Sequence, residues 1–301
     1  MKKLTDATRR KIANGILSFF RFVLIFGLAF IILKPIIYRI LLSFMSPADL
    51  LDNSVRVIPK HFSLYYWKQA IEGMNLKISM TNTFLLSLSV GLLQVVSCAL
   101  VGYGLGRFKF RGNRILFIFV IIIMLVPYQV ISVAQYLNFV YFKIGPWTVN
   151  LSDTFIPLLV LAFTGMGMKE GLYIYLMRET FTSLPKDLED AAYIDGAGIW
   201  KTFWHIMLPN ARGMLATVFL FSFCWQWTDT TYSTLHLRNV KILANSFGDI
   251  IIRTGVFRDS NGTFIAKSAG ILIIMIPLLF LFSLCQKFLV KSLSHTGLSG
   301  E

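Results

Sequence analysis

The sequence is poor in the residues that most often build metal centres and disulfide frameworks. It holds three cysteines and four histidines, and its 15 acidic residues face 29 lysines and arginines. Each cysteine lies alone inside an apolar block, with no CxxC pair and no histidine at metal-ligand spacing: Cys98, Cys224 and Cys285. We therefore expect neither disulfide bonds nor a bound metal ion.

Motifs for nucleotide binding and catalysis are also missing. A phosphate-binding loop requires GxxxxGK[ST], and the nearest stretch, GTFIAKS at 262–268, lacks the second glycine. The histidines are scattered, and no Ser/His/Asp or paired-carboxylate pattern is present. We expect no catalytic residue and no cofactor bound by this chain. A membrane-embedded enzyme, one rival interpretation, has no catalytic cluster to support it.

Long apolar blocks are what the sequence does have. Hydrophobic residues make up 55% of the chain and charged residues 15%, which is typical of an integral membrane protein rather than a soluble domain. Six blocks reach the roughly 20 residues that a spanning helix needs: 17–42, 83–106, 115–137, 154–177, 212–232 and 266–288. The first has no small-residue cleavage site, so it predicts an anchor and not a removed signal peptide. We expect an all-α, six-helix membrane protein with one domain, 1–301.

The basic residues predict how the chain is oriented. Net charge is +14, and the positive-inside bias of membrane proteins explains it without a nucleic-acid partner. Lysines and arginines gather in the head at 2–11, in the connector RFKFRGNR at 107–114, around the 184–209 stretch and in the tail. The longer loops on the other side carry fewer of them. We therefore expect both termini and the 184–209 stretch on the cytoplasmic side.

The stretch from 184 to 209 is polar but does not have the pattern of a flexible loop. Pro185 can open a helix, and the acids at 187–190 lie near the positive end of its dipole. Asp195-Gly196-Ala197-Gly198 breaks that helix, and a second amphipathic run follows at 199–208. Two short helices joined by a glycine elbow predict a rigid knob that a partner outside the membrane grips.

Two sets of polar residues inside the apolar blocks are candidates for a transport path. Lys169 and Glu170 lie deep in the fourth block. A charge in lipid costs about 3 kcal/mol or more, so these two form an ion pair or line a polar path. The second set joins aromatic rings to polar groups: Tyr128, Gln129, Gln135, Asn138, Trp225, Gln226, Trp227 and Asp229. Such neighbours bind sugars in many proteins, but Trp225 and Trp227 equally fit an interfacial aromatic belt.

The polar stretch carries a motif with a known spacing. Asp190-Ala191-Ala192 is followed by Gly196, nine residues, and Ile206-Met207-Leu208-Pro209. This resembles the EAA motif in the membrane subunits of binding-protein-dependent ABC importers. The spacing is complete, and the one departure is Asp190, where that family most often has glutamate. The substitution keeps the charge on a stem that is one methylene shorter.

The resemblance extends over nearly the whole chain and is to the carbohydrate branch, the maltose-permease G-type subunit group. The stretches that carry it are YGLGRFKFRG at 103–112, MLVPYQV at 124–130, the blocks 174–198 and 208–229, and the last span with its QKFLVKSL tail. The resemblance implies a type I importer permease, with six transmembrane helices and a coupling helix between the fourth and fifth. It places the chain in a bacterial cytoplasmic membrane.

The resemblance also implies partners. The chain would pair with a second homologous permease, in this family usually a different chain. It would dock on two ATP-binding subunits that carry the ATP and magnesium, and receive solute from an extracytoplasmic binding protein. The residues implied at the ATPase contact are Glu189, Asp190, Ala191, Ala192, Asp195, Gly196, Ala197 and Gly198. Trp200, Phe203 and Trp204 would brace this knob against the bundle.

The implied function is import of a sugar or oligosaccharide. An importer for another solute is the nearest alternative. An ion-driven secondary transporter is a weaker one, because neither inverted repeats nor a chain of intramembrane carboxylates is visible.

Overall fold

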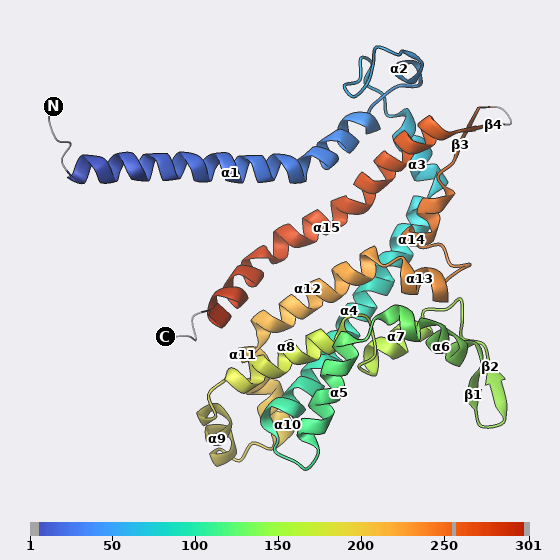
Figure 1. Ribbon diagram of the computed structural model, residues 1–301. Helices are drawn as coiled ribbons and strands as arrows, with labels where there is room; N and C mark the ends of the chain where they lie inside the picture. The colour runs from blue at the N-terminus through green and yellow to red at the C-terminus, as the bar shows by residue number, and fades with distance from the viewer. Residues whose placement is uncertain (1–5, 255–256, 298–301) are drawn as a thin grey trace. The chain divides into compact units, whose positions relative to one another are not determined.

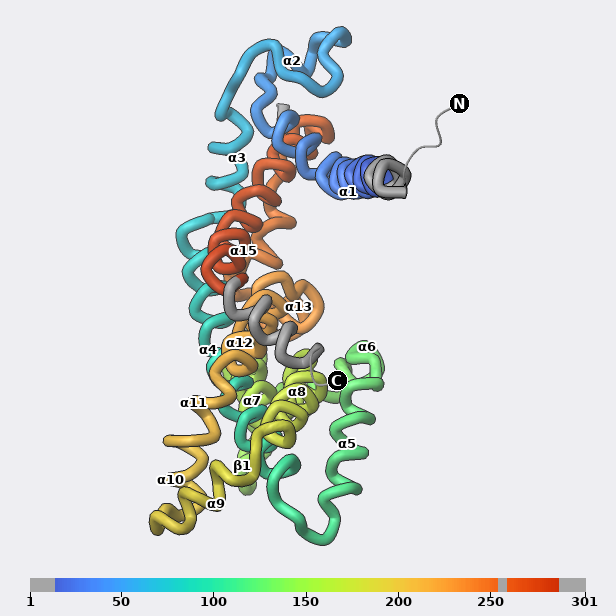
Figure 2. Tube along the Cα trace, turned by 90° about the vertical axis from the view of Figure 1, so that its left-hand side faces the viewer, coloured from blue at the N-terminus to red at the C-terminus, as the bar shows by residue number. Residues whose placement is uncertain are grey.

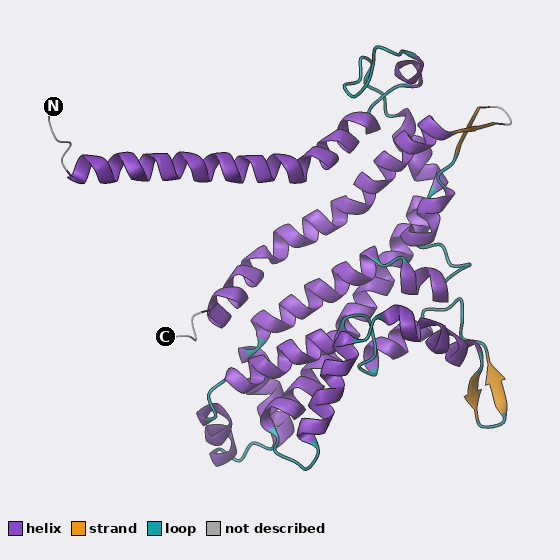
Figure 3. Cartoon of the chain, viewed as in Figure 1, coloured by secondary structure: helices purple, strands orange, loops and turns teal. Residues whose placement is uncertain are grey.

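The structure is a computed structural model that describes residues 6–254 and 257–297, with side chains from 14 to 253 and from 259 to 286. The first five residues of the predicted basic head lie outside the described residues. The chain is mostly helical (Figures 1 and 3). It divides into two compact units, Met1–Glu72 with Ile250–Ile273, and Gly73–Asp249 with Ile274–Glu301.

The first unit contains the first helix, the start of the last helix and several short elements. Its elements are α1 (Asp6–Ser43), α2 (Pro47–Leu51), most of α3 (Tyr65–Gly73), β3 (Ile252–Thr254), β4 (Phe257–Asp259) and the start of α15 (Ser260–Gly297). Ser46 caps α2, because its side chain accepts a hydrogen bond from the backbone of Asp49. The two strands pair antiparallel, with Ile252 opposite Asp259.

The second unit is built around α4 (Leu76–Arg107), which packs against α7 (Ile156–Phe163), α8 (Glu170–Ser183) and α12 (Arg212–Thr228). Glycines let helix backbones of this unit lie very close together. A Cβ on Gly102 would lie 2.7 Å from the Cβ of Met177, and one on Gly171 would lie 2.9 Å from the backbone nitrogen of Met124. Small residues at these positions let the helix backbones pack directly.

Shorter elements complete the second unit. They are α5 (Asn113–Leu125), α6 (Tyr128–Val140), β1 (Phe142–Ile144), β2 (Trp147–Val149), α9 (Asp187–Ile194), α10 (Ile199–Thr202), the π-helical turn Phe203–Met207, α11 (Leu208–Asn210), α13 (Thr231–His236), α14 (Leu243–Ser246) and the 3-10 turn Phe247–Asp249. Strands β1 and β2 form an exposed antiparallel hairpin.

Three predicted spans are continuous helices in the described residues. Segments Asn14–Ser43, Leu76–Arg107 and Ser260–Gln286 are long and apolar enough to cross a membrane. They match the predicted blocks 17–42, 83–106 and 266–288. Two further candidates are bent pairs: Asn113–Leu125 with Tyr128–Val140, at 101°, and Ile199–Asn210 with Arg212–Thr228, at 77°. The first bend falls at Pro127, which lacks the N–H that would continue the helix.

The prediction of one uninterrupted helix across 154–177 is wrong. Helix α7 ends at Phe163, and α8 begins at Glu170. Between them the backbone of Gly165 (φ +79°) and of Lys169 (φ +61°) is left-handed, which an α-helix does not allow. Side chains pair the freed backbone groups: Gln94 donates to the carbonyl of Met168, and Glu170 accepts from the N–H of Gly167. A break at this depth requires such partners.

The predicted pair of short helices between 184 and 209 is confirmed. Helix α9 ends at Ile194, Gly196 follows with φ +77°, and α10 begins at Ile199. The second helix is less regular than its pattern predicts, because it passes through a π-helical turn before α11. Figures 1 and 2 both place this segment at the same end of the second unit as the basic α4–α5 connector.

Candidate functional site

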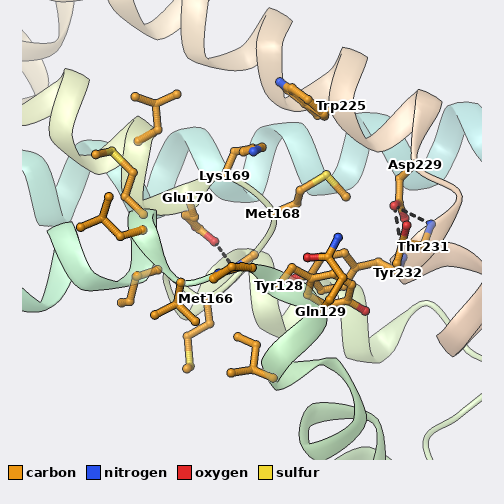
Figure 4. A pocket seen from close by; sticks show the side chains of 18 of the residues that line it. Tyr128, Gln129, Met166, Met168, Lys169, Glu170, Trp225, Asp229, Thr231 and Tyr232 are labelled. Atoms are coloured by element: carbon orange, nitrogen blue, oxygen red, sulfur yellow. Dashed lines mark hydrogen bonds between the residues drawn. The ribbon is translucent and has the colours of Figure 1, made fainter.

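A cavity of about 630 Å³ lies in the second unit where the two breaks in the apolar blocks meet. Its walls come from the Pro127 bend, from the α7–α8 break, from the end of α12 and from the start of α13 (Figure 4). Six of the residues that the sequence predicts for a transport path line it: Tyr128, Gln129, Lys169, Glu170, Trp225 and Asp229. Residues far apart in the chain therefore converge on one space.

Glu170 is fully buried in the cavity wall, and its carboxylate is held by hydrogen bonds to the protein. It accepts hydrogen bonds from Ser97 Oγ at 2.5 Å and from the N–H of Gly167 at 2.6 Å. Gln94 extends this network, because it donates to the carbonyl of Met168 and accepts from the Ser222 hydroxyl. The network joins α4, the α7–α8 break and α12. Glu170 thus holds the break in place.

The Lys169 side chain is exposed to the cavity, unlike the buried side chain of Glu170. Within the part of the chain that the structure describes, no ion pair joins Lys169 to Glu170 or joins either residue to another helix. The Lys169 ammonium lies 5.0 Å from the centroid of the Trp225 ring, within range of a cation–π contact. Trp225 is 47% exposed. The two side chains give the cavity a cation and an accessible aromatic face.

Asp229 is buried and caps a helix. Its carboxylate accepts from the backbone N–H of Thr231 (2.9 Å), Tyr232 (3.1 Å) and Ser233 (2.6 Å), and also from the Ser233 hydroxyl. These are the N–H groups that the start of α13 would otherwise leave without partners. Asp229 fixes the turn between α12 and α13 and so places the threonines of that turn in the cavity wall.

Four predicted path residues lie elsewhere. Gln226 is buried and donates to Ser233 Oγ, and Trp227 is buried and donates from its indole N–H to the carbonyl of Ile274. Gln135 is buried in α6, whereas Asn138 is exposed on the same helix. None of the four lines the large cavity. Adjacent positions on a helix point in different directions, which the local composition alone does not reveal.

Sequence reasoning missed other residues of the cavity wall. Met166 and Met168 come from the α7–α8 break, and Thr228, Thr231 and Tyr232 come from the α12–α13 turn. The available signal was the pair of glycines in Thr164-Gly165-Met166-Gly167, which interrupts an otherwise apolar helix pattern.

The 184–209 segment presents most of its predicted contact residues to solvent. Asp190, Ala191, Asp195, Gly196 and Gly198 are exposed, Ala197 is half-buried, and Ala192 is buried. No heavy atom lies within 4 Å of where a Cβ on Gly196 would be. The elbow is therefore open on its outer side, and a partner could approach the backbone there.

The prediction that three aromatic residues brace the segment holds for one of them. Phe203 is 2% exposed, with its ring centroid 4.9 Å from that of Tyr103 and 6.2 Å from that of Phe181. Trp200 and Trp204 touch the Phe203 ring but are 67% and 56% exposed. Of the three rings, Phe203 therefore packs against the bundle, and most of both indoles faces solvent.

Glu189 faces inward, unlike Asp190 beside it. Its carboxylate forms an ion pair with Arg107, with Nε to Oε2 at 2.7 Å, and accepts a hydrogen bond from the Tyr103 hydroxyl at 2.9 Å. The side chains of Arg107 and Glu189 are 5% and 11% exposed. The motif's two consecutive acids therefore have different surroundings.

The sequence is similar to a known protein family and to characterised members of it. The family model for "binding-protein-dependent transport system inner membrane component" matches residues 99–295. The melibiose/raffinose/stachyose import permease protein MelC of Bacillus subtilis is 27% identical over 248 residues, covering 82% of this chain and 85% of that protein. The maltodextrin transport system permease protein MalD of Streptococcus pneumoniae is 26% identical over 282 residues, covering 93% and 94%.

One solved structure is similar over almost its full length. A chain of a bacterial ABC transporter involved in the import of the acidic polysaccharide alginate aligns with a TM-score of 0.74 at 20% sequence identity, covering 95% of this chain and 99% of that one. At this identity the likeness concerns the fold.

Proposed function

Because this chain belongs to the family of binding-protein-dependent transport system inner membrane components, we propose that it forms half of the translocation path of an ATP-driven importer for a sugar or oligosaccharide. The cavity at the two helix breaks is the observation that carries this proposal. An exposed indole lies there beside amide and hydroxyl groups. Relatives named for melibiose and maltodextrin transport support the carbohydrate class.

The importer would contain more than this chain. A second homologous permease would complete the path, two ATP-binding subunits would hydrolyse ATP on the cytoplasmic side, and an extracytoplasmic binding protein would deliver the solute. The family's description as binding-protein-dependent supports that last partner. The basic connector and the 184–209 segment lie at one end of the second unit. The positive-inside bias assigns that end, and both termini, to the cytoplasm.

The 184–209 segment would be the coupling element that the ATPase grips. The exposed Asp190, the open elbow at Gly196 and the exposed indoles of Trp200 and Trp204 support this role. ATP-driven closure of the ATPases would move the segment. The helices behind it would then rock as rigid bodies between outward- and inward-facing states.

The experiment that tests this function is reconstitution of the chain with its candidate partners in lipid vesicles. Uptake of a labelled oligosaccharide should require ATP on the side of the membrane that carries the ATPase subunits, and the binding protein on the other side. A calorimetric screen of the binding protein against neutral and acidic oligosaccharides, amino acids and peptides would name the solute class. Uptake that needs no ATPase would contradict the proposal, and a binding protein that takes only non-sugars would support the alternative solute class.

Replacement of Trp225 by alanine should lower sugar uptake while the permease level stays normal. The exposed ring face is the stacking surface of the cavity, and its loss should raise the half-saturating concentration about tenfold, equivalent to about 1.4 kcal/mol. Trp225→Phe should retain most of the uptake because a ring face remains. The matched control is Trp147→Ala, since Trp147 is 72% exposed on the β2 strand and away from the cavity. Equal loss in both alanine variants would contradict a stacking role.

A further inference from the structure

The buried ion pair between Arg107 and Glu189 joins two parts of the chain that are far apart in sequence. Arg107 is the last residue of α4, and Glu189 lies in the first turn of α9. Their charged atoms are 2.7 Å apart, and both side chains are almost fully shielded from solvent. A buried charge whose partner is removed is strongly unfavourable, so each of these groups depends on the other.

The Arg107 guanidinium also holds the connection between α8 and α9. Besides Nε to Glu189, its Nη1 donates to the carbonyl of Leu184 at 3.0 Å and its Nη2 to the carbonyl of Pro185 at 3.3 Å. These carbonyls follow the end of α8, where the helix leaves backbone groups without partners. One side chain thus fixes both the exit from α8 and the start of α9.

Tyr103, one turn before Arg107 on α4, adds the third member. Its hydroxyl donates to the second oxygen of Glu189 at 2.9 Å. Its ring lies 5.4 Å from that of Phe181 on α8 and 4.9 Å from that of Phe203 after α10. Both ends of the 184–209 segment therefore meet the same turn of α4.

Few other contacts hold α9. Among its eight residues, all of them described, the buried ones are Glu189 and Ala192. An alanine side chain offers little apolar area, so polar contacts attach α9 to α4: those of Glu189 with Arg107 and Tyr103, and an interaction of Tyr193 with Tyr103. Asp190, the next residue, is exposed and does not attach α9 to α4.

We propose that Tyr103, Arg107 and Glu189 form an internal clamp that makes the 184–209 segment move with α4 as one body. This inference rests on the proposed coupling function and deepens it. It assigns Glu189 to the permease interior as a positioning residue, and leaves Asp190 as the acid that meets the ATPase. Movement of the segment would reach the cavity through α4, which carries Ser97 and Gln94 of the cavity network on the same helix.

The test uses the complete importer in lipid vesicles with its binding protein, and measures solute imported per ATP hydrolysed. Glu189→Gln and Arg107→Gln should each lower this ratio at least about fivefold, while the ATPase subunits still copurify and hydrolyse ATP. The double variant should be no worse than the poorer single variant, because both remove one interaction. Tyr103→Phe, which keeps the ring, should lower the ratio less. Asp187→Asn, an exposed acid on the same helix, is the matched control.

Three results would overturn the clamp. They are an unchanged ratio in both single variants, effects that multiply in the double variant, and loss of ATPase binding in Glu189→Gln alone, which would place Glu189 at the ATPase surface. If Arg107→Gln does not accumulate in the membrane, Arg107→Lys replaces it, since lysine keeps the charge but not the three-way hydrogen bonding. Failure of the wild-type importer to couple ATP to uptake would instead count against the proposed function.

Discussion

Gly196→Trp is expected to abolish solute uptake while the permease still inserts in the membrane. The left-handed backbone at φ +77° costs any L-residue about 1–2 kcal/mol. A Cβ there would meet no heavy atom of this chain within 4 Å and the residue is exposed, so we expect a bulky side chain to extend into the surface that the ATPase is proposed to occupy. Uptake should fall at least about 100-fold, equivalent to about 2.7 kcal/mol. Vesicle uptake and membrane immunoblotting measure the two quantities.

Smaller substitutions separate backbone strain from bulk. Gly196→Ala adds strain with one methyl group, whereas Gly196→Asn adds bulk with a residue that tolerates the left-handed region. If the partner needs close access, Asn should lower uptake more than Ala. Gly213→Ala is the matched control, because Gly213 is equally open but lies in the regular helix α12. Full uptake by Gly196→Trp with the ATPase still bound would remove the coupling role from this elbow.

The sequence predicts well what depends on local pattern. The continuous spans and the break at Gly196 follow from apolar block length and from the conformational range of glycine. The block 115–137, predicted as one span, is instead bent at Pro127, which lacks the N–H that would continue the helix. The 184–209 segment could also be located from the sequence, because the signals for two short helices joined at a glycine lie entirely within the segment.

The direction of each side chain is less accessible from the sequence. Glu189 and Asp190 are consecutive acids that the sequence alone assigns to the same contact surface, yet one is buried against Arg107 and the other is exposed. The difference depends on which face of α9 meets α4, and therefore on a contact between residues 82 positions apart. Trp225 and Trp227 differ for the same reason: one faces the cavity, and the other packs on Phe223 and Ile274.

The break in the fourth apolar block shows a second limit. Mean apolarity over 154–177 is high enough to predict a span, and averaging conceals two glycines and one left-handed lysine. The break is stable because side chains supply hydrogen-bond partners for the backbone groups that the helix no longer pairs. These side chains are Gln94 and Ser97, both on α4, and Glu170. Those partners come from another helix, so no window within the fourth block contains the information.

Glu170→Leu is expected to reduce the amount of folded permease more than the activity of each folded molecule. Its removal leaves the Gly167 N–H without its acceptor, whereas the Ser97 hydroxyl can still donate to the carbonyl of Ala162 at 3.0 Å. Each buried unsatisfied donor costs about 1–3 kcal/mol. Glu170→Gln should be intermediate, because one amide oxygen can still accept from Ser97 but its NH₂ would face the Gly167 N–H. Thermal unfolding in detergent and uptake per folded molecule measure the two effects.

Lys169→Met provides the contrast one residue away. Lys169 is exposed to the cavity, so its loss should leave the unfolding temperature within a few degrees of wild type and change uptake instead. Glu179→Ala, which removes a half-exposed acid of α8, is the control for the loss of an acid from that helix in Glu170→Leu. Normal folding with lost uptake in Glu170→Leu would move Glu170 to the transport path. The sequence treats Lys169 and Glu170 as one pair, but their surroundings differ: Lys169 is exposed to the cavity, and Glu170 is buried in the network at the helix break.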